Sequence, residues 1–378
     1  MKKDLITSFN DLPAERKAEL ITAISHSTSA LKGKKITAGF DGFIDTIARI
    51  IKDKEEHKDP AVFSTIKQFG EYIIEKQGAS FSLELETQAI KLGGNMPIMA
   101  NALGRFGISV NCIGTLGYPQ VHPVLKNISP NCNLHSFAEP GTSTAHEFND
   151  GKMLIAQMGA VNESGWDKIV EVIGIDTLIR LYNECQLMCI LNWSEIDVST
   201  DIWKGLLKSI LPSYKVNQKQ LAFFDLSDCS KRSTGAITEA LNLLNGFSQY
   251  TDVILSLNKN ETGVIYRTIF NKNPAETLAD TGTELFKKMS LHTLLIHTSK
   301  EVIAINKEQM VVMKTFFTPK PKMSTGAGDN FNAGFCAGLL LELDPELAIV
   351  LANAFSGFYV RTGVSAEAKD IIEFLQNN

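Results

Sequence analysis

Long apolar runs are missing from this 378-residue sequence, and none approaches the roughly 20 residues that cross a bilayer. The start, Met1-Lys2-Lys3-Asp4, has no apolar stretch after its lysines, so no secretory signal is expected. We therefore expect a cytoplasmic protein with no membrane partner.

Cysteine pairs and basic clusters are missing as well. The 6 cysteines show neither a zinc-ligand spacing nor a disulfide framework, so we expect reduced, mostly buried thiols. The net charge is -5, and no basic stripe of the kind that nucleic acid requires is visible. No G-x-G-x-x-G follows the first apolar segment, which argues against a dinucleotide-dependent oxidoreductase. With 44% hydrophobic and 21% charged residues, the composition is that of a globular protein.

Short apolar runs alternate with helical patterns through most of the chain. The predicted strands are Ile36–Phe40, Val110–Ile113, Leu187–Leu191, Leu221–Phe224, Val253–Leu257 and Leu294–Ile296, and helices are predicted at Met96–Phe106, Ser199–Leu211 and Thr234–Leu244. Strands that are apolar throughout and separated by helices predict an α/β fold with a mainly parallel sheet covered on both faces. Residues 11–31 have an amphipathic helical pattern. We expect residues 1–32 to form a helical extension of a domain spanning 33–378.

Two segments have the period of a strand with one wet face. Phe81, Leu83 and Leu85 alternate with polar residues, and a strong hairpin signal joins Thr142–Phe148 to Lys152–Gln157. These segments predict a small one-sided sheet built from residues near 80–92 and 132–160. Its apolar face needs a cover, which a substrate or a second copy of the chain could supply.

The most informative segment is Ser324-Thr325-Gly326-Ala327-Gly328-Asp329. Phe331, Phe335 and Leu339 follow at helical spacing, so a helix is predicted to begin close to Gly328. Small residues ahead of a helix let successive amides approach one anion, where the helix dipole also favours negative charge. The segment therefore predicts an anion site, with Gly326, Ala327 and Gly328 as the anion hole.

Asp329 is out of place in a site that only binds anions, because a carboxylate repels a phosphate. As a general base it could accept the proton of an attacking hydroxyl while the neighbouring amides stabilise the phosphoryl oxygens. An ordinary helix N-cap is the competing interpretation.

Two further polar segments follow or precede predicted elements. Gly93 and Gly94, with Asn95, come just before a helix and permit close approach of the backbone to a ligand. Asn258 and Glu261 follow a buried strand, at the edge where ligands of open α/β sheets bind. They are suited to hold Mg²⁺ through water.

Together these segments resemble the ribokinase family of carbohydrate kinases, also called the PfkB family, over residues 33–375. The segment Ser324–Phe335 is similar to the carboxyl-terminal signature of that family, with Asp329 at the position of its catalytic base. Gly93-Gly94-Asn95 resembles its substrate-side glycine motif, Asn258-x-x-Glu261 its Mg²⁺ and phosphate motif, and Gly159-Ala160-Val161-Asn162 the segment that leaves its lid hairpin.

The resemblance implies a doubly wound sheet with a β lid, ATP as donor, and transfer to a primary hydroxyl of a sugar or nucleoside. Asp45 is similar to the aspartate that binds sugar hydroxyls in that family, and Asp41 is its rival. The resemblance also assigns Asn258, Thr298 and Asn353 to the nucleotide, and it suggests a homodimer formed through the lid.

The sequence also departs from the family pattern. Met323 and Ser324 stand where the signature usually has Asp-Thr, which leaves potassium activation open. Ile98 stands where many members have an asparagine that contacts substrate, so a less polar pocket is expected there. A nucleoside kinase, and a sugar-binding regulator without turnover, remain alternatives to a sugar kinase.

Overall fold

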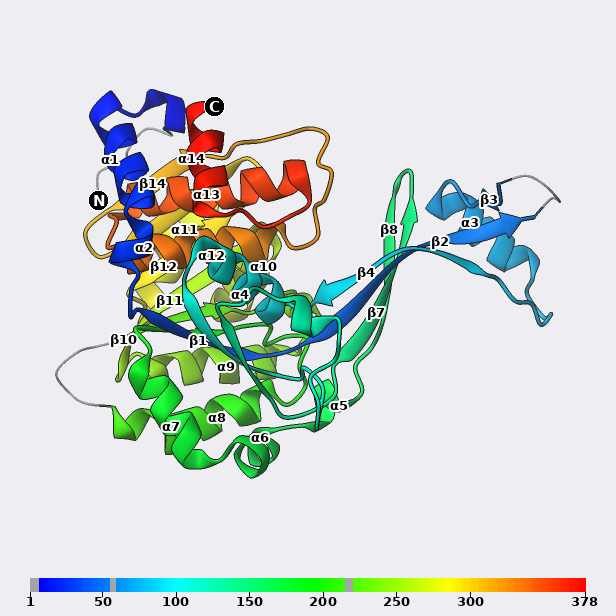
Figure 1. Ribbon diagram of the computed structural model, residues 1–378, viewed down its shortest axis with the longest axis horizontal. Helices are drawn as coiled ribbons and strands as arrows, with labels where there is room; N and C mark the ends of the chain where they lie inside the picture. Colours follow the sequence, from blue (N-terminus) through cyan, green and yellow to red (C-terminus); the bar gives the residue numbers. More distant parts are fainter. Residues whose placement is uncertain (1–6, 55–58, 215–219) are drawn as a thin grey trace.

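The computed structural model describes residues 7–54, 59–214 and 220–378 of the chain. A large sheet with helices on both faces forms the body, and a smaller sheet projects from one side of it (Figure 1). None of the helices in these three ranges is long and apolar enough to cross a membrane.

The large sheet has nine strands among the described residues, in the order β14-β13-β12-β11-β10-β9-β1-β5-β6. Their bounds are β1 (Lys35–Phe40), β5 (Ser109–Gly114), β6 (Cys132–Ser136), β9 (Leu187–Ile190), β10 (Gln220–Asp225), β11 (Thr251–Asn258), β12 (Thr293–His297), β13 (Glu301–Asn306) and β14 (Met310–Lys314). The strands from β12 to β6 pair in parallel, and β13 and β14 add an antiparallel edge. The sheet is wound outward in both directions from β1, so the expected doubly wound, mainly parallel fold is confirmed.

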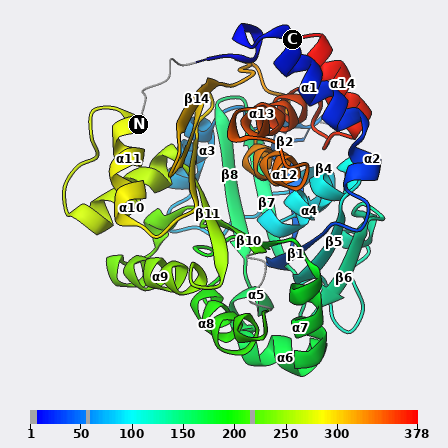
Figure 2. The same cartoon turned by 90° about the vertical axis from the view of Figure 1, so that its left-hand side faces the viewer.

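Helices cover both faces of this sheet (Figure 2). One face carries α1 (Ala14–Ser25), α4 (Asn95–Phe106), α12 (Ala327–Leu340), α13 (Pro345–Thr362) and α14 (Ala368–Gln376), with the short α2 (Ser27–Ala30) beside them. The other face carries α6 (Trp166–Ile173), α7 (Ile175–Glu184), α8 (Ser199–Ser209), α9 (Thr234–Phe247), α10 (Lys259–Phe270) and α11 (Leu278–Lys288), after the short α5 (Ala160–Glu163). Within the expected N-terminal extension, α1 packs against α13 and α14, on the side of the body away from the lid (Figure 1).

The smaller sheet, with its connections, is called the lid here and comprises residues 43–93 and 141–157. Its strands are β2 (Phe43–Asp53), β3 (Ala61–Val62), β4 (Leu85–Gly93), β7 (Gly141–Phe148) and β8 (Gly151–Gln157), and α3 (Ile66–Glu75) lies on it. The central strand β2 pairs with β4 on one side and with β7 on the other. The predicted hairpin is present, since β7 and β8 pair around Asn149 and Asp150.

Two expectations about the small sheet need correction, and one of its strands was missed. Cys132–Ser136 pairs in parallel with β5 in the large sheet, so it is not part of the lid. Residues 81–84 precede the strand that their alternation predicted. The ladder with β2 begins at Leu85, and the carbonyl of Glu84 accepts one further hydrogen bond from the backbone N–H of Ile51 (2.9 Å). The central lid strand β2 was not predicted, because its sequence mixes apolar and polar residues without a strict alternation.

Candidate active site

Polar residues gather at the carboxyl edge of the large sheet, next to the lid strands β2 and β4, which carry Asp45 and Gly93. Asp41 follows β1, Asp225 ends β10, Asn258 ends β11 and His297 ends β12. The amino end of α12, with Asp329 in its first turn, carries the predicted anion hole. Strand-to-helix connections at this edge are the usual ligand site of doubly wound sheets.

Asp41 is fully buried and fixes the start of α4. Its carboxylate accepts the backbone N–H groups of Asn95 (2.8 Å) and Met96 (2.9 Å) and the amide Nδ2 of Asn192 (2.7 Å). Burial raises the pKa of Asp41 to about 6, and these three hydrogen bonds oppose the rise. Asp41 therefore acts as a cap for a helix whose N-cap, Gly94, has no side chain to offer.

Asp45, the rival sugar ligand, is less enclosed. Its Oδ1 accepts a hydrogen bond from Ser143 Oγ (2.7 Å), across the β2–β7 pair. Burial raises its pKa, while Ser143, Lys91 and Lys152 act in the opposite direction. With one hydrogen bond from a side chain, this carboxylate keeps acceptor capacity for a ligand.

The two glycines of the predicted substrate motif make room for these aspartates. A Cβ on Gly93 would lie 2.2 Å from the Asp45 carboxyl carbon. A Cβ on Gly94, whose φ is +89°, would lie 2.7 Å from Asp41 Oδ2. The close approach predicted from the sequence is therefore made by the site's own carboxylates.

A hydrogen-bond chain joins the Asp41 side of the site to Asp225. Asn95 Nδ2 donates to Ser227 Oγ (3.0 Å), and the backbone N–H of Ser227 donates to Asp225 Oδ1 (2.8 Å). Asn332 Nδ2 donates to the other oxygen of Asp225 (2.6 Å). Sequence reasoning missed Asp225, although its signal was present: a carboxylate directly after the predicted strand Leu221–Phe224.

Asn258 and Glu261 form a capping box at the start of α10. The backbone N–H of Glu261 donates to Asn258 Oδ1 (3.0 Å), and that of Asn258 donates to Glu261 Oε2 (2.8 Å). Glu261 is only 4% exposed, and burial followed by repulsion from Asp225 raises its pKa to about 9. Two buried carboxylates that repel each other are a fitting place for a divalent cation.

Direct coordination by several side chains is not what these residues offer. In the described parts of the chain, no group of three or more His, Cys, Asp and Glu side chains is arranged to hold a metal ion. Asp225 and Glu261 therefore fit Mg²⁺ that keeps much of its water shell, as the ion does beside substrate phosphates.

Asp329 lies at the third position of α12 and is partly exposed. Desolvation, then Asp225 and Asp41, raises its pKa well above the ordinary value. Ahead of it, Gly326 has a φ of +90°, and the amide of Ala327 donates to the Ser324 carbonyl (3.2 Å). An anion bound in this turn would accept a hydrogen bond from the Ala327 amide, either together with the Ser324 carbonyl or in place of it.

A cavity of about 320 Å³ opens on the other side of this turn. Its lining includes Ala327 and Gly328 from the anion hole, together with Thr298 and Asn353 from the predicted nucleotide residues. His297 also lines it, with its ring 5.0 Å from that of Phe331, and burial lowers the pKa of His297 to about 4. A neutral histidine at this place supplies an aromatic wall.

Thr298 and Asn353 have structural hydrogen bonds as well. Thr298 Oγ1 accepts from the amides of Lys300 and Glu301 and so shapes the β12–β13 turn. Asn353 Nδ2 donates to the carbonyl of Lys314 (3.3 Å). Ile98, where a polar substrate contact was considered, is 8% exposed and packs close to Gly326.

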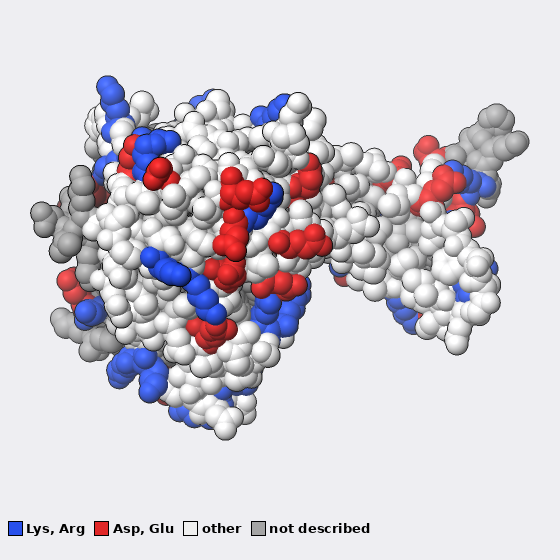
Figure 3. Space-filling model, turned by 90° about the horizontal axis from the view of Figure 1, so that it is seen from below, with Lys and Arg blue, Asp and Glu red and all other residues white. Residues whose placement is uncertain are grey.

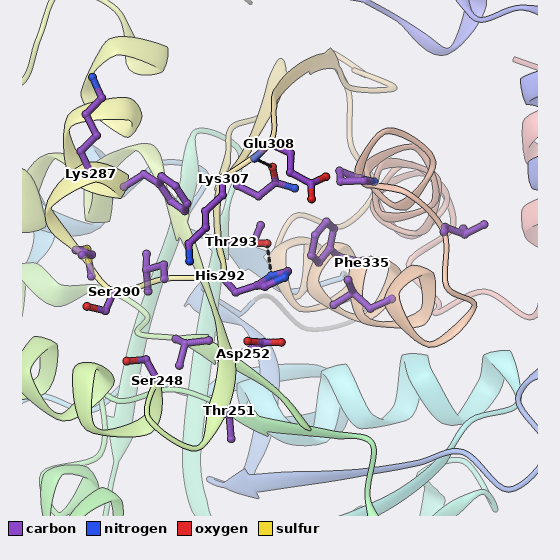
Figure 4. Close-up of a pocket in the computed structure, with 18 residues that line it drawn as sticks. Ser248, Thr251, Asp252, Lys287, Ser290, His292, Thr293, Lys307, Glu308 and Phe335 are labelled. Atoms are coloured by element: carbon purple, nitrogen blue, oxygen red, sulfur yellow. Dashed lines mark hydrogen bonds between the residues drawn. The ribbon is translucent and has the colours of Figure 1, made fainter. Parts of the chain in front are cut away.

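The larger cavity in Figure 4, about 740 Å³, lies at the opposite edge of the sheet. It is lined by the amino ends of β11 and β12, including Thr251, Asp252 and Thr293, and by Phe335 of α12. It contains none of the predicted site residues, so the two cavities are separate features.

Known proteins resemble this chain in sequence and in fold. The sequence model of the prokaryotic ketohexokinase family matches residues 15–378, nearly the whole chain. The chain belongs to the prokaryotic ketohexokinase family. A ketohexokinase of Haloferax volcanii is 25% identical over 336 residues, which cover 88% of each chain.

Solved structures with the same fold include ribokinases. Arabidopsis thaliana ribokinase, in complex with ribose and ATP, has a TM-score of 0.64 at 15% identity, covering 91% of this chain and 98% of that one. A putative ribokinase II of E. coli in its apo form has a TM-score of 0.65 at 15% identity, covering 91% and 99%. These matches confirm the ribokinase-like fold with a lid.

As a member of the ketohexokinase family, this protein is a carbohydrate kinase that transfers a phosphoryl group from ATP to a sugar. The nucleoside-kinase and non-catalytic alternatives are not favoured.

Proposed function

We propose that this protein phosphorylates a primary hydroxyl of a ketohexose, with Asp329 as the general base. The observation that carries the proposal is the position of Asp329 among the other carboxylates. Its pKa is raised first by desolvation, and then by Asp225, from the metal side, and by Asp41 and Asp45, from the sugar side. A base, a sugar site and a cation site within electrostatic reach of one another are what phosphoryl transfer to an alcohol needs. The name of the Haloferax relative supports a ketohexose as acceptor.

In the proposed reaction the sugar hydroxyl oxygen attacks the γ-phosphorus of ATP. A bond forms between that oxygen and phosphorus, the bond from phosphorus to the β–γ bridging oxygen breaks, and the hydroxyl proton passes to Asp329. The amides of Gly326, Ala327 and Gly328 stabilise the phosphoryl oxygens. Mg²⁺, when bound with ATP, supplies charge neutralisation at the β- and γ-phosphates. Asp225, Glu261 and, through its cap, Asn258 would hold its water shell.

On the sugar side, we assign Asp45 to the sugar hydroxyls, because it retains acceptor capacity. Asp41 positions α4 and presents Asn95, with Gly93 and Gly94 leaving space for both carboxylates. Thr298 and Asn353 line the cavity that we assign to the nucleoside of ATP.

The lid is proposed to mediate a homodimer. Leu85, Ile90, Leu154 and Ile155 of the lid are 46% to 57% exposed. Apolar side chains gathered on strands that project from the body need a cover in water. A second copy of the lid has the matching surface.

A coupled ADP-release screen tests the proposed acceptor. Ketohexoses, aldohexoses, pentoses, nucleosides and sugar phosphates would be compared with MgATP, and a ketohexose should give the highest kcat/KM. A ketohexose has primary hydroxyls at both ends, so NMR of the product would identify the one that is phosphorylated. Higher kcat/KM for a nucleoside or an aldose would contradict the assignment.

A further inference from the structure

Two lysines of the lid touch the loop that leads into the anion hole. Lys91, on β4, donates to Met323 Sδ (3.5 Å), and Lys152, on β8, donates to Thr325 Oγ1. Met323 and Thr325 lie on either side of Ser324, immediately before Gly326. The lid therefore meets this loop through two ammonium groups.

These ammonium groups have weak partners. Within the described residues, neither lysine lies within 4.0 Å of a carboxylate oxygen, and their acceptors are a thioether and a hydroxyl. The nearest acidic influences are Asp45, which acts on both lysines, and Glu147, which pairs across the hairpin with Lys152. Desolvation lowers the pKa of each lysine despite these carboxylates, and for Lys91 the charge of Lys152 adds to the effect.

Other lysines of the lid are paired differently. Lys52, Lys54, Lys67 and Lys76 each lie within 4.0 Å of an Asp or Glu oxygen. Elsewhere in the lid, lysines are thus paired with carboxylates. Lys91 and Lys152, by contrast, both contact the loop and have no carboxylate in such a pair within the described residues. Like charges kept close together in a partly desolvated place are unfavourable unless an anion joins them.

A cavity lined by several cationic side chains adjoins Lys152. This cavity of about 420 Å³ lies between the lid and the loop, lined by Lys152, Met323 and Ser324 and also by Arg49 and Lys322. Glu147 is the acidic side chain in this lining. The space-filling view shows the lid as an arm that projects from the body (Figure 3).

We propose that Lys91 and Lys152 bind the phosphoryl group while it passes from ATP to the sugar. The proposal rests on the function proposed above and adds to it two residues that contact the transferred group. During transfer the bond to the β–γ bridging oxygen breaks and the bond to the sugar oxygen forms, while both ammonium groups stay protonated and compensate the charge on the phosphoryl oxygens. Lysine suits this role as a mobile point charge.

Equilibrium binding without sugar tests the proposal. Lys91→Met and Lys152→Met should each weaken ATP binding about tenfold, as expected for the loss of a charge-assisted contact. The affinities for ADP and adenosine, which lack the transferred group, should stay within about twofold of wild type. Lys91→Arg and Lys152→Arg should recover most of the ATP affinity. Lys54→Met, which removes a lid lysine paired with Glu84, is the matched control.

Three outcomes would overturn the proposal. If ATP and ADP affinities fall equally, or if only the melting temperature falls, the lysines merely hold the lid in place. If wild type prefers a ketohexose monophosphate and the methionine variants lose that preference, the two lysines bind a phosphate that is already on the acceptor. Because the ATP and ADP titrations need no turnover, failure of the proposed acceptor assignment would leave this test valid.

Discussion

At the residue scale, the site gathers carboxyl groups whose ionisation is costly without ligands. The pKa of Asp41 is raised by burial from 3.8 to about 6. Its folded-state pKa exceeds the unfolded value, so its favourable contribution to stability is present below pH 3.8 and is lost as the pH rises through 6. By this linkage, folding with an ionised Asp41 costs about 3 kcal/mol at neutral pH, which the rest of the fold must offset.

The pH dependence of turnover reports on Asp329. A base must be deprotonated to accept a proton, and the pKa of Asp329 is raised by desolvation and by neighbouring carboxylates. We therefore expect kcat/KM to fall as the pH is lowered, with a midpoint clearly above the ordinary aspartate value of 3.8. Rate measurements across the acidic range, with enzyme stability checked at each pH, would show this limb. A profile that stays flat down to pH 4 or so would contradict it.

Asp225 is expected to set the affinity for Mg²⁺. Asp225→Asn removes one of two buried carboxylates that repel each other. The pKa of Glu261 should therefore fall toward its ordinary value, and the site should attract the cation less strongly. Titration of activity with Mg²⁺ at fixed ATP should show a half-saturation about tenfold higher. Asp167→Asn, an exposed position on α6, serves as the control. An unchanged titration would remove Asp225 from the cation site.

At the scale of elements, the β4–α4 junction can be tested with matched glycines. Gly94 and Gly78 have similar φ values, +89° and +84°, but only a Cβ on Gly94 would meet another group, Asp41 Oδ2. Gly78→Ala should cost about 1 kcal/mol from backbone strain alone. Gly94→Ala should cost about 1–3 kcal/mol more, with a raised KM for the sugar. Urea unfolding measures the difference, and equal losses for the two variants would argue against the collision with Asp41.

Most strands of the parallel sheet were predictable because each contains a largely apolar run. Val253–Leu257, for example, lies inside β11, which is buried on both faces. The mostly polar β6 (Cys132–Ser136) is the exception and was expected in the lid instead. The lid was harder to predict, since β2 is exposed on parts of both faces and lacks a clean period. The predicted alternation begins at Phe81, but the observed strand begins at Leu85, because pairing with β2 decides where β4 starts.

Residues of the candidate site could be predicted from the sequence only where neighbouring residues form a recognisable local motif. Glycines beside Asp329 mark an anion site within a few residues, so that segment could be identified directly. Asp225, Asn192 and Ser227 have no such neighbours and join the site through the order of strands in the sheet. Which of Asp41 and Asp45 faces a ligand depends on their hydrogen bonds, which sequence spacing does not determine.

At the scale of the whole molecule, the proposed lid dimer has a direct test. Light scattering should give a mass twice the 41.6 kDa of the chain for wild type. Ile155→Glu places a charge among the exposed apolar lid residues and should yield monomers, because burying an unpaired charge costs several kcal/mol. Val364→Glu, at a body position with the same 54% exposure, should leave the dimer intact. A monomeric wild-type protein at micromolar concentration would refute this assembly.

Phosphorus NMR of the reaction mixture tests the central claim most directly. With MgATP and a ketohexose, wild type should produce ADP and a sugar phosphate ester in equal amounts. Asp329→Asn should bind both substrates with little change, yet lower the rate of ester formation by about 10²–10⁴-fold, because the hydroxyl proton has no acceptor. A sugar phosphate formed at the wild-type rate by Asp329→Asn, or no ester from any ketohexose with wild type, would contradict the account.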